Sequence, residues 1–223
     1  MASALGDIKI LDLTDPLGHY AGYLLANLGA EVTKVEPPSG DPSRKWEPLL
    51  PDTPEIEAGM QFLLMNVGKK GITLDIRAQE GKDTFLKLLE ETDVLLQSWS
   101  PDEASALGFD PIELREQFPN LINASVTGWG LYGPYASLAY SDIVSLAMAG
   151  VMNLSGFAEG PPTQLPDNQG FHCASLNLSA GVVAAILERD SSCIAQDVEV
   201  SLHESLLMAE ETAMQTADIR GID

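Results

Sequence analysis

With 223 residues, of which 45% are hydrophobic and 20% charged, the chain is long enough to bury one large core, and its composition argues against a disordered protein. Its 33 acidic and 12 basic residues give a formal charge of −21, which argues against nucleic acid or an anionic membrane as partner, since both need Lys and Arg facing phosphates. No apolar run approaches the roughly 18 residues of a membrane helix, no secretory pattern is visible, and two cysteines without a CxxC pair predict no disulfide framework. We therefore expect a globular, cytoplasmic protein.

Strands and helices alternate along the chain. A strand over residues 8–13 is followed by a helix over 19–28 that ends at Gly29, and a second strand over 31–36 stops at two prolines. The hydrophobic pattern then predicts, in order, a helix at 55–65, a strand at 72–76, a helix at 80–91, a strand at 94–97, a helix at 112–117, a strand at 121–126, helices at 143–152 and 176–188, a strand at 198–202 and a helix at 204–216. This order predicts an α/β fold, a parallel Rossmann-like sheet with helices on both faces, in one domain over residues 1–223.

The glycines at 128, 130 and 133 spell GxGxxG directly after a predicted strand. A dinucleotide site of this kind needs a helix that opens at the third glycine and an acidic residue about 20 positions further on. Pro134 follows Gly133 here, and no acidic residue stands at that distance. The pattern therefore argues against NAD, and the three histidines show no metal-ligand spacing.

Six blocks follow one another in the order and at the spacing of a known family. They are LDLTDPLGHYAGYLLANLGAEVTKVEPPSGD, FLLMNVGKKGITLDI, DVLLQSWSPDEASALGFD, GWGLYGP, GPPTQ before an apolar helix, and QDVEVSLHESLL. Together they resemble the class III (family III) CoA-transferases, the family of formyl-CoA transferase, carnitine CoA-transferase and α-methylacyl-CoA racemase. Family members are nearly twice as long, so the resemblance covers their N-terminal half, the large domain. It implies CoA or acyl-CoA as substrate.

The resemblance implies CoA contacts at seven positions, which are Gly18, Asn66, Lys69, Trp99, Gly128, Gly130 and Asp142. Independent reasoning from the residues leaves alternatives open at three of them. The ammonium of Lys69 could bind a phosphate of CoA, or Lys69 could simply mark a solvated turn before a strand. Trp99 suits a binding surface but also simple packing. Asp142 suits a site but also the dipole of the helix that it opens.

Several positions depart from the family pattern. The family arginine after the second strand is replaced here by Pro37 or Pro38, and a second arginine used on CoA phosphates falls at Ala106. Ser98 replaces an asparagine and Asp102 replaces a glycine in the same block. Because guanidinium groups make the strong contacts to phosphate, we expect weaker binding of CoA by this chain.

The most consequential departure is Phe171. Counting forward from Pro161-Pro162, or back from the end of the following helix, places it where the family carries its nucleophilic aspartate. That carboxylate attacks the acyl-CoA carbonyl, and phenylalanine offers no such oxygen. Asp167, in a Pro-Asp-Asn turn, and the neighbouring His172 are the remaining candidates for catalysis, although Asp is common in turns and a single His is usually structural.

Three hypotheses follow. The first is a non-catalytic subunit or half of a class III CoA-transferase, working in an interlaced dimer or larger complex with a homologous subunit that carries the aspartate, as in heteromeric transferases of the benzylsuccinate type. The second is an active racemase-like or isomerase-like member that uses His172 or Asp167 as base. The third is a non-enzymatic scaffold.

Overall fold

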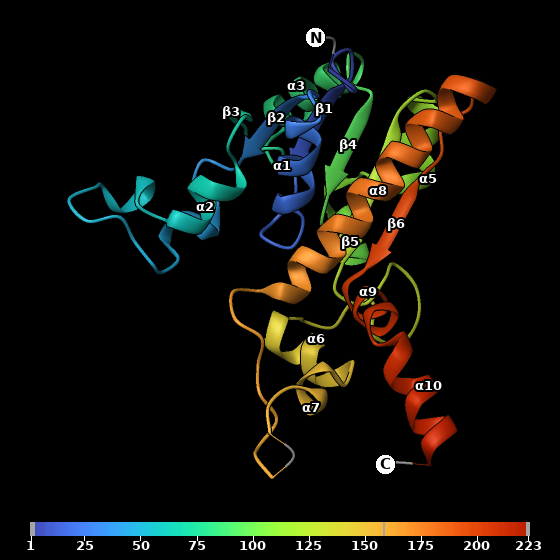
Figure 1. Ribbon diagram of the computed structural model, residues 1–223. Helices are drawn as coiled ribbons and strands as arrows, with labels where there is room; N and C mark the ends of the chain where they lie inside the picture. Colours follow the sequence, from blue (N-terminus) through green and yellow to red (C-terminus); the bar gives the residue numbers. More distant parts are fainter. Residues whose placement is uncertain (1–2, 158, 222–223) are drawn as a thin grey trace.

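A computed structural model describes residues 3–157 and 159–221 and contains one six-stranded parallel sheet (Figure 1). The strands are β1 (Lys9–Leu13), β2 (Glu31–Glu36), β3 (Lys70–Thr73), β4 (Val94–Gln97), β5 (Ile122–Thr127) and β6 (Val198–Ser201). Their order across the sheet is β3-β2-β1-β4-β5-β6, and in the centre Leu11 of β1 aligns with Thr33 of β2 and Leu95 of β4. The predicted α/β class and parallel sheet are confirmed.

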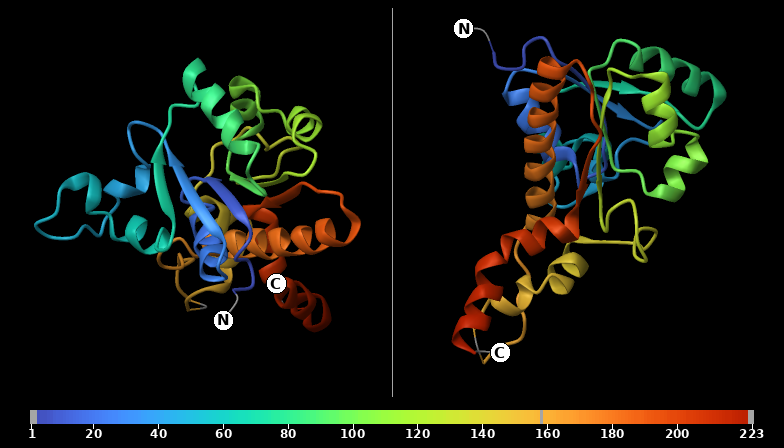
Figure 2. Two further views of the ribbon diagram at one scale, coloured as in Figure 1. Left: turned by 90° about the horizontal axis from the view of Figure 1, so that it is seen from above. Right: turned by 90° about the vertical axis from the view of Figure 1, so that its right-hand side faces the viewer.

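Helices connect the strands. They are α1 (His19–Asn27), α2 (Met60–Met65), α3 (Gln79–Leu89), α4 (Pro101–Leu107), α5 (Pro111–Gln117), α6 (Asp142–Met148), α7 (Val151–Leu154), α8 (Gln169–Ser192), α9 (Leu202–Ala209) and α10 (Glu211–Arg220), with short 3-10 turns η1 (Pro42–Lys45) and η2 (Glu55–Glu57). Figure 2 shows α1 and α8 on one face of the sheet and α3, α4 and α5 on the other. In Figure 1, α6, α7, α9 and α10 lie beyond the carboxyl edge of the strands.

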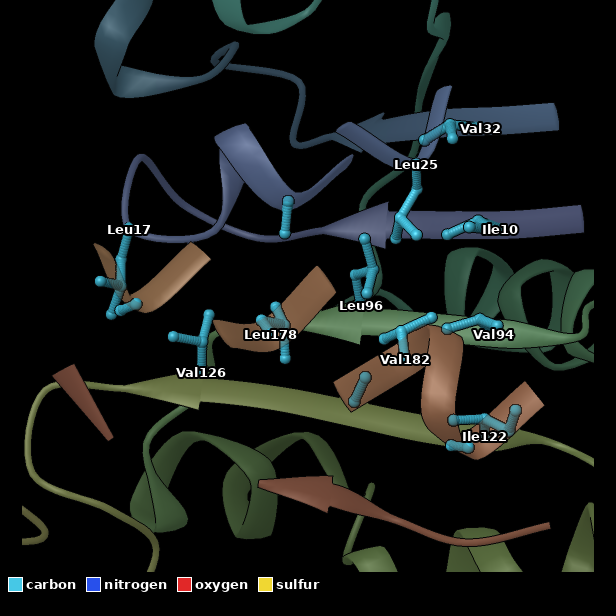
Figure 3. Close-up of a cluster of buried hydrophobic side chains, with 14 of the residues drawn as sticks. Ile10, Leu17, Leu25, Val32, Val94, Leu96, Ile122, Val126, Leu178 and Val182 are labelled. Atoms are coloured by element: carbon cyan, nitrogen blue, oxygen red, sulfur yellow. The ribbon is translucent and has the colours of Figure 1, made fainter. Parts of the chain in front are cut away.

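Two apolar cores form because alternate strand residues point to opposite faces. On the first face, Val94 and Leu96 of β4 pack with Leu178 and Val182 of α8 (Figure 3). On the second, Leu95 packs in a cluster with aromatic rings from α3 and from the segments next to α4. Burial of each such side chain stabilises the fold by about 1.5–3 kcal/mol.

The helix α8 meets the length and hydropathy of a membrane span, with half of its most apolar window buried. It packs along β5, β6 and α1, and the Ser175 hydroxyl donates to the Leu17 carbonyl of the β1–α1 loop at 2.6 Å. Its apolar side therefore has a partner within the chain.

Several predicted boundaries are wrong. The helix α4 is missing from the prediction although Ser100 and Glu103 form a capping box around Pro101. The predicted helix at 143–152 is two helices, since Gly150 takes a left-handed φ of 90° between them. The helix expected at 204–216 is likewise divided into α9 and α10.

The other differences are smaller. The helix expected at 55–65 is reduced to η2 and α2, separated by Gly59, which lies against the η1 backbone. The third strand covers 70–73 instead of 72–76, and the helix expected at 176–188 begins at Gln169.

Candidate functional site

A cleft of about 1060 Å³ opens at the carboxyl ends of β1 to β4. It is lined by the segments that follow these strands, including Thr14 and Asp15 after β1, and Ser98 and Trp99 after β4. The chain continues from β1 to β2 on one side and from β4 to β5 on the other, so β1 and β4 flank the topological switch point. Open α/β sheets bind their ligands at this place.

Trp99 lies both in the second core and at the wall of the cleft. The residue is 9% exposed, and its ring stacks on Phe109, with centroids 5.5 Å apart, inside the second core. The same residue lines the cleft. The structure therefore makes Trp99 a core residue whose exposed edge forms part of the cleft wall.

Beneath one side of the cleft lies a buried charge cluster of Asp12, His19, Lys34, Asp41 and Lys69. Lys69 Nζ is 2.7 Å from Asp12 Oδ2, and Lys34 Nζ is 3.8 Å from Asp12 Oδ1 and 3.4 Å from Asp41 Oδ2. His19 Nε2 lies 2.9 Å from Asp41 Oδ2 and 3.0 Å from Lys34 Nζ, and Lys34 also donates to the Thr14 carbonyl. All five side chains are at most 5% exposed.

The cluster shifts the pKa values of Asp12, Asp41 and His19. Burial alone would raise the pKa of Asp12, but Lys34 and Lys69 outweigh that effect and hold it well below its ordinary value. Asp41 behaves in the same way, because His19 and Lys34 counter its burial. Burial, and next Lys34, lower the pKa of His19, so its imidazole stays neutral near pH 7. Two carboxylates thus balance two ammonium groups around a neutral ring.

This arrangement gives Lys69 a role different from a solvated turn. Its side chain is 1% exposed and is engaged by Asp12 and by the carbonyl of His19 at 2.9 Å. The ammonium is therefore committed within the chain, and a phosphate contact would require it to leave Asp12. Asn66 ends α2, where its Nδ2 donates to the Phe62 carbonyl at 2.9 Å.

The glycine positions follow from close packing. A Cβ on Gly18 would lie 2.6 Å from Thr14 Cβ, and a Cβ on Gly128 would lie 2.5 Å from Tyr140 Cδ1. Gly130 adopts a left-handed φ of 88°, and its N–H donates to the Thr127 hydroxyl at 2.9 Å. After Gly133 the next helix begins only at Asp142, so this loop offers no helix N-terminus at the place where a dinucleotide fingerprint has one.

Phe171 lies in the first turn of α8 and is 8% exposed. Its ring meets Tyr140 edge-on at 6.2 Å, and its N–H donates to Asp142 Oδ1 at 3.2 Å. Asp142 is 4% exposed, and its Oδ2 has no hydrogen-bond partner among the described residues. Burial raises the pKa of Asp142, although the backbone N–H groups of Phe171 and Gly170 act in the opposite direction. Asp142 therefore caps α8 as a buried carboxyl beside residue 171.

The two weak catalytic candidates also lie near Phe171. Both Asp167 and His172 are close enough to influence the titration of Asp142. Asp167 is exposed in a left-handed turn with φ 56°, and His172 is half-buried against Tyr20, with ring centroids 5.2 Å apart. The structure thus brings Asp142, Asp167, Phe171 and His172 together at the start of α8.

One contact that the sequence did not predict joins the cleft to this group. The Tyr140 hydroxyl donates to Asp15 Oδ2 at 2.6 Å, and Asp15 lines the cleft. Burial raises the pKa of Asp15, and burial followed by Asp15 raises the pKa of Tyr140. Asp15 lies in the first family block and Tyr140 in none of the six, so only the tertiary contact pairs them.

The fold and this site can be compared with known proteins. The sequence model of CoA-transferase family III matches residues 5–221. The chain belongs to this family. It is 32% identical over 221 residues to a subunit of succinyl-CoA:(R)-benzylsuccinate CoA-transferase from Thauera aromatica, covering 99% of this chain and 54% of the relative. It is 33% identical over 208 residues to formyl-CoA:oxalate CoA-transferase from Streptomyces avermitilis, covering 93% of this chain and 50% of that relative.

A solved structure agrees with these relatives. A CAIB/BAIF family protein from Brucella suis superposes with a TM-score of 0.93 at 28% identity, covering 99% of this chain and 59% of that one. Family III CoA-transferases act on CoA thioesters, and this chain spans about half the length of the curated relatives it matches.

Proposed function

We propose that this chain is a subunit or half of a class III CoA-transferase that moves CoA between an acyl-CoA and a carboxylic acid in the cytoplasm. It acts with a homologous partner that carries the catalytic aspartate, in an interlaced dimer or a larger complex. We infer that residues 1–223 form one domain, the N-terminal large domain of this family. The observation that carries the proposal is the phenyl ring of Phe171, buried against Tyr140 in the first turn of α8.

The chemistry of the family explains why this residue matters. An aspartate at this place attacks the acyl-CoA carbonyl, forms a mixed anhydride and later becomes an aspartyl-CoA thioester. Phe171 can perform none of these steps, and one carboxyl oxygen of the neighbouring Asp142 is engaged by the N–H of Phe171. The relative from Thauera aromatica is itself named a subunit, which supports a heteromeric assembly.

The roles of the surrounding residues follow from the same proposal. Gly18, Gly128 and Gly130 keep the loops tight enough for a thioester to approach the backbone. Trp99 forms one wall of the cleft, Asn66 holds the end of α2, and Lys69 ties the α2–β3 loop to β1 through Asp12. Asp142 positions the first turn of α8.

Affinity purification of the tagged chain from its source cells tests the partner. We expect an untagged homologue with Asp at the position of Phe171 to co-elute. Incubation of the purified assembly with a panel of acyl-CoAs, followed by mass spectrometry, should locate the covalent adduct on that partner. An adduct on any residue of this chain would overturn the non-catalytic role.

The grouping of Asp142, Asp167 and His172 around Phe171 supports a second candidate, an active racemase-like or isomerase-like enzyme with His172 or Asp167 as base. The substitution His172→Ala in the chain purified without a partner separates the two. Loss of a measurable proton-exchange activity on acyl-CoA substrates would favour this candidate. A chain with neither partner nor activity would be a scaffold.

A further inference from the structure

One tyrosine ring connects the wall of the cleft with the first turn of α8. The Tyr140 hydroxyl donates to Asp15 Oδ2 at 2.6 Å, and Asp15 lines the cleft. The ring of the same residue meets the Phe171 ring edge-on, with centroids 6.2 Å apart. Tyr140 therefore covers the side of residue 171 that is turned toward Asp15.

The Tyr140 ring lies directly against the backbone of the glycine loop. A Cβ on Gly128 would come within 2.4 Å of Tyr140 Cγ and 2.5 Å of its Cδ1. Any larger residue at 128 would have to displace the ring, so the absence of a side chain there provides its seat. The ring also packs against the first core. Its position is thus set by packing as well as by the bond of its hydroxyl.

Asp15, which accepts that hydroxyl, is itself held by two loops. Its N–H donates to the Ser98 hydroxyl after β4 at 2.8 Å, and its Oδ1 accepts the N–H of Leu17 at 2.9 Å. The carboxyl group is therefore fixed in orientation, with Oδ2 directed to Tyr140. Short bonds from a hydroxyl to a carboxyl oxygen are among the stronger hydrogen bonds in proteins.

Chemistry at residue 171 requires a free approach to its side chain. A nucleophile and the carbonyl that it attacks must come within about 3–3.5 Å of each other. Phe171 is 8% exposed, with the first core around it and the Tyr140 ring on the side toward Asp15. A carboxylate substituted at this position would lie behind the same ring.

We propose that Tyr140 is a gate, whose ring blocks access to position 171 as long as its hydroxyl is bound to Asp15. The gate is a barrier to catalysis by this chain that is separate from the missing nucleophile. The inference rests on the proposed function in one respect, namely that position 171 is where the family carries its nucleophile. It adds the residue that decides whether an acyl group can reach that position.

Cysteine labelling measures access to position 171 directly. In Phe171→Cys, iodoacetamide should modify position 171 slowly, and mass spectrometry of the proteolytic peptides gives the rate. Adding Tyr140→Ala should raise this rate at least about tenfold, because labelling no longer depends on a local opening. Adding Tyr140→Phe, which keeps the ring and removes only the bond to Asp15, should raise it about threefold to tenfold. Rates measured from about pH 7 to about pH 9 correct for differences in thiolate fraction.

The chain supplies its own controls. Cys193 is exposed and gives the reference rate of a free thiol in each variant, whereas Cys173 is half-buried in the same helix as residue 171 and should keep its rate. The matched control variant is Tyr132→Ala, which removes an 80% exposed tyrosine of the same loop and should leave labelling at position 171 unchanged. Tyr140→Phe keeps the test open if Tyr140→Ala does not fold.

A rate at position 171 that neither Tyr140 variant raises would overturn the gate. So would a rate in Phe171→Cys that already equals the rate of Cys193. A parallel rise at Cys173 would also overturn it, because the whole start of α8 would then have loosened. Labelling needs neither a partner nor transfer activity, so the gate can fail while the proposed function holds, and the reverse.

Discussion

Replacing Lys69 by Met removes one charge of the buried cluster while keeping an apolar stem of similar length. The variant leaves Asp12, which is fully buried, without its nearest cation at 2.7 Å. Asp12 still accepts hydrogen bonds from the N–H and hydroxyl of Thr14, and Lys34 still faces it at 3.8 Å. The perturbation is therefore the loss of one of the two cations that keep this carboxylate ionised.

Breaking a buried ion pair by removing one partner costs about 3–5 kcal/mol. Because Lys34 remains, we expect the lower end, about 3 kcal/mol. That is a large share of the roughly 5–15 kcal/mol that stabilises a typical domain. For a chain of this length it corresponds to a fall in Tm of roughly 6–12 °C.

Urea unfolding at pH 7, followed by circular dichroism and tryptophan fluorescence, measures the loss. The adjacent Lys70 provides the control, since its ammonium is 66% exposed and pairs with Glu31 at the surface. The free energy of unfolding of Lys70→Met should stay within about 0.5 kcal/mol of the parent.

The pH dependence gives a second test. The depressed pKa of Asp12 adds stability above its unfolded pKa of about 3.9, and this stability is lost as pH falls below that value. Lys69→Met has already lost part of this stability, so the difference in unfolding free energy between the variant and the parent should narrow below about pH 4. A Lys69→Met variant as stable as Lys70→Met, or a gap that does not change with pH, would refute the buried-pair reasoning.

Three further outcomes are expected. Gly128→Ala should lose about 1–3 kcal/mol in urea unfolding, because its Cβ would lie 2.5 Å from Tyr140 Cδ1, whereas Gly71→Ala, with open space around it, should change little. Phe171→Ala should lower the free energy of unfolding by about 3–5 kcal/mol in the same assay, because it leaves a cavity where a ring that is only 8% exposed was packed. A smaller loss than that of Gly128→Ala would contradict the burial of Phe171 in the core. Because the pKa of His19 is lowered in the folded chain, the stability that its neutral ring provides is present above about pH 6.5 and is lost as pH falls below it. His19→Gln should therefore reduce the slope of the unfolding free energy against pH between pH 7 and pH 5 by up to about 1.4 kcal/mol per pH unit. An unchanged slope would exclude this role of His19.

The sequence predicts the sheet well because its strands are marked locally. β5 is buried at every position, and the alternation of its apolar residues Ile122, Ala124 and Val126 with polar ones between two turns is visible in the sequence. The start of α8 is different. Its first turn is fixed when Asp142, 29 residues away from Phe171, accepts that residue's N–H. Phe171 and Ala174 already follow the helical spacing of Leu178, but the tertiary bond that fixes where the helix begins leaves no local signal in the sequence.

The candidate site also has one part that the sequence indicates and one part that it does not. Asp142 and Phe171 could each be named because the family resemblance fixes their positions in the sequence, and His172 because it adjoins Phe171. The buried charge cluster could not, since its members come from β1, α1, β2, the η1 approach and the α2–β3 loop. Each of these residues, taken alone, is an ordinary polar residue near the end of an element. Only the parallel sheet, which gathers the carboxyl ends of β1 and β2, makes them neighbours.

The position of β6 bears on how the chain folds. β5 pairs on one side with β4, which precedes it in the sequence, and on the other side with β6. In the second pairing Ser125 aligns with Glu199, although α6, α7 and α8 lie between these two residues in the sequence. Closing so long a loop is slow compared with forming the local β1–α1–β2 unit. Until β6 is available, one edge of β5 has no partner strand, and unpaired strand edges bind readily to other chains. During synthesis, the interval between the emergence of β5 and of β6 is therefore when this protein is most prone to aggregate.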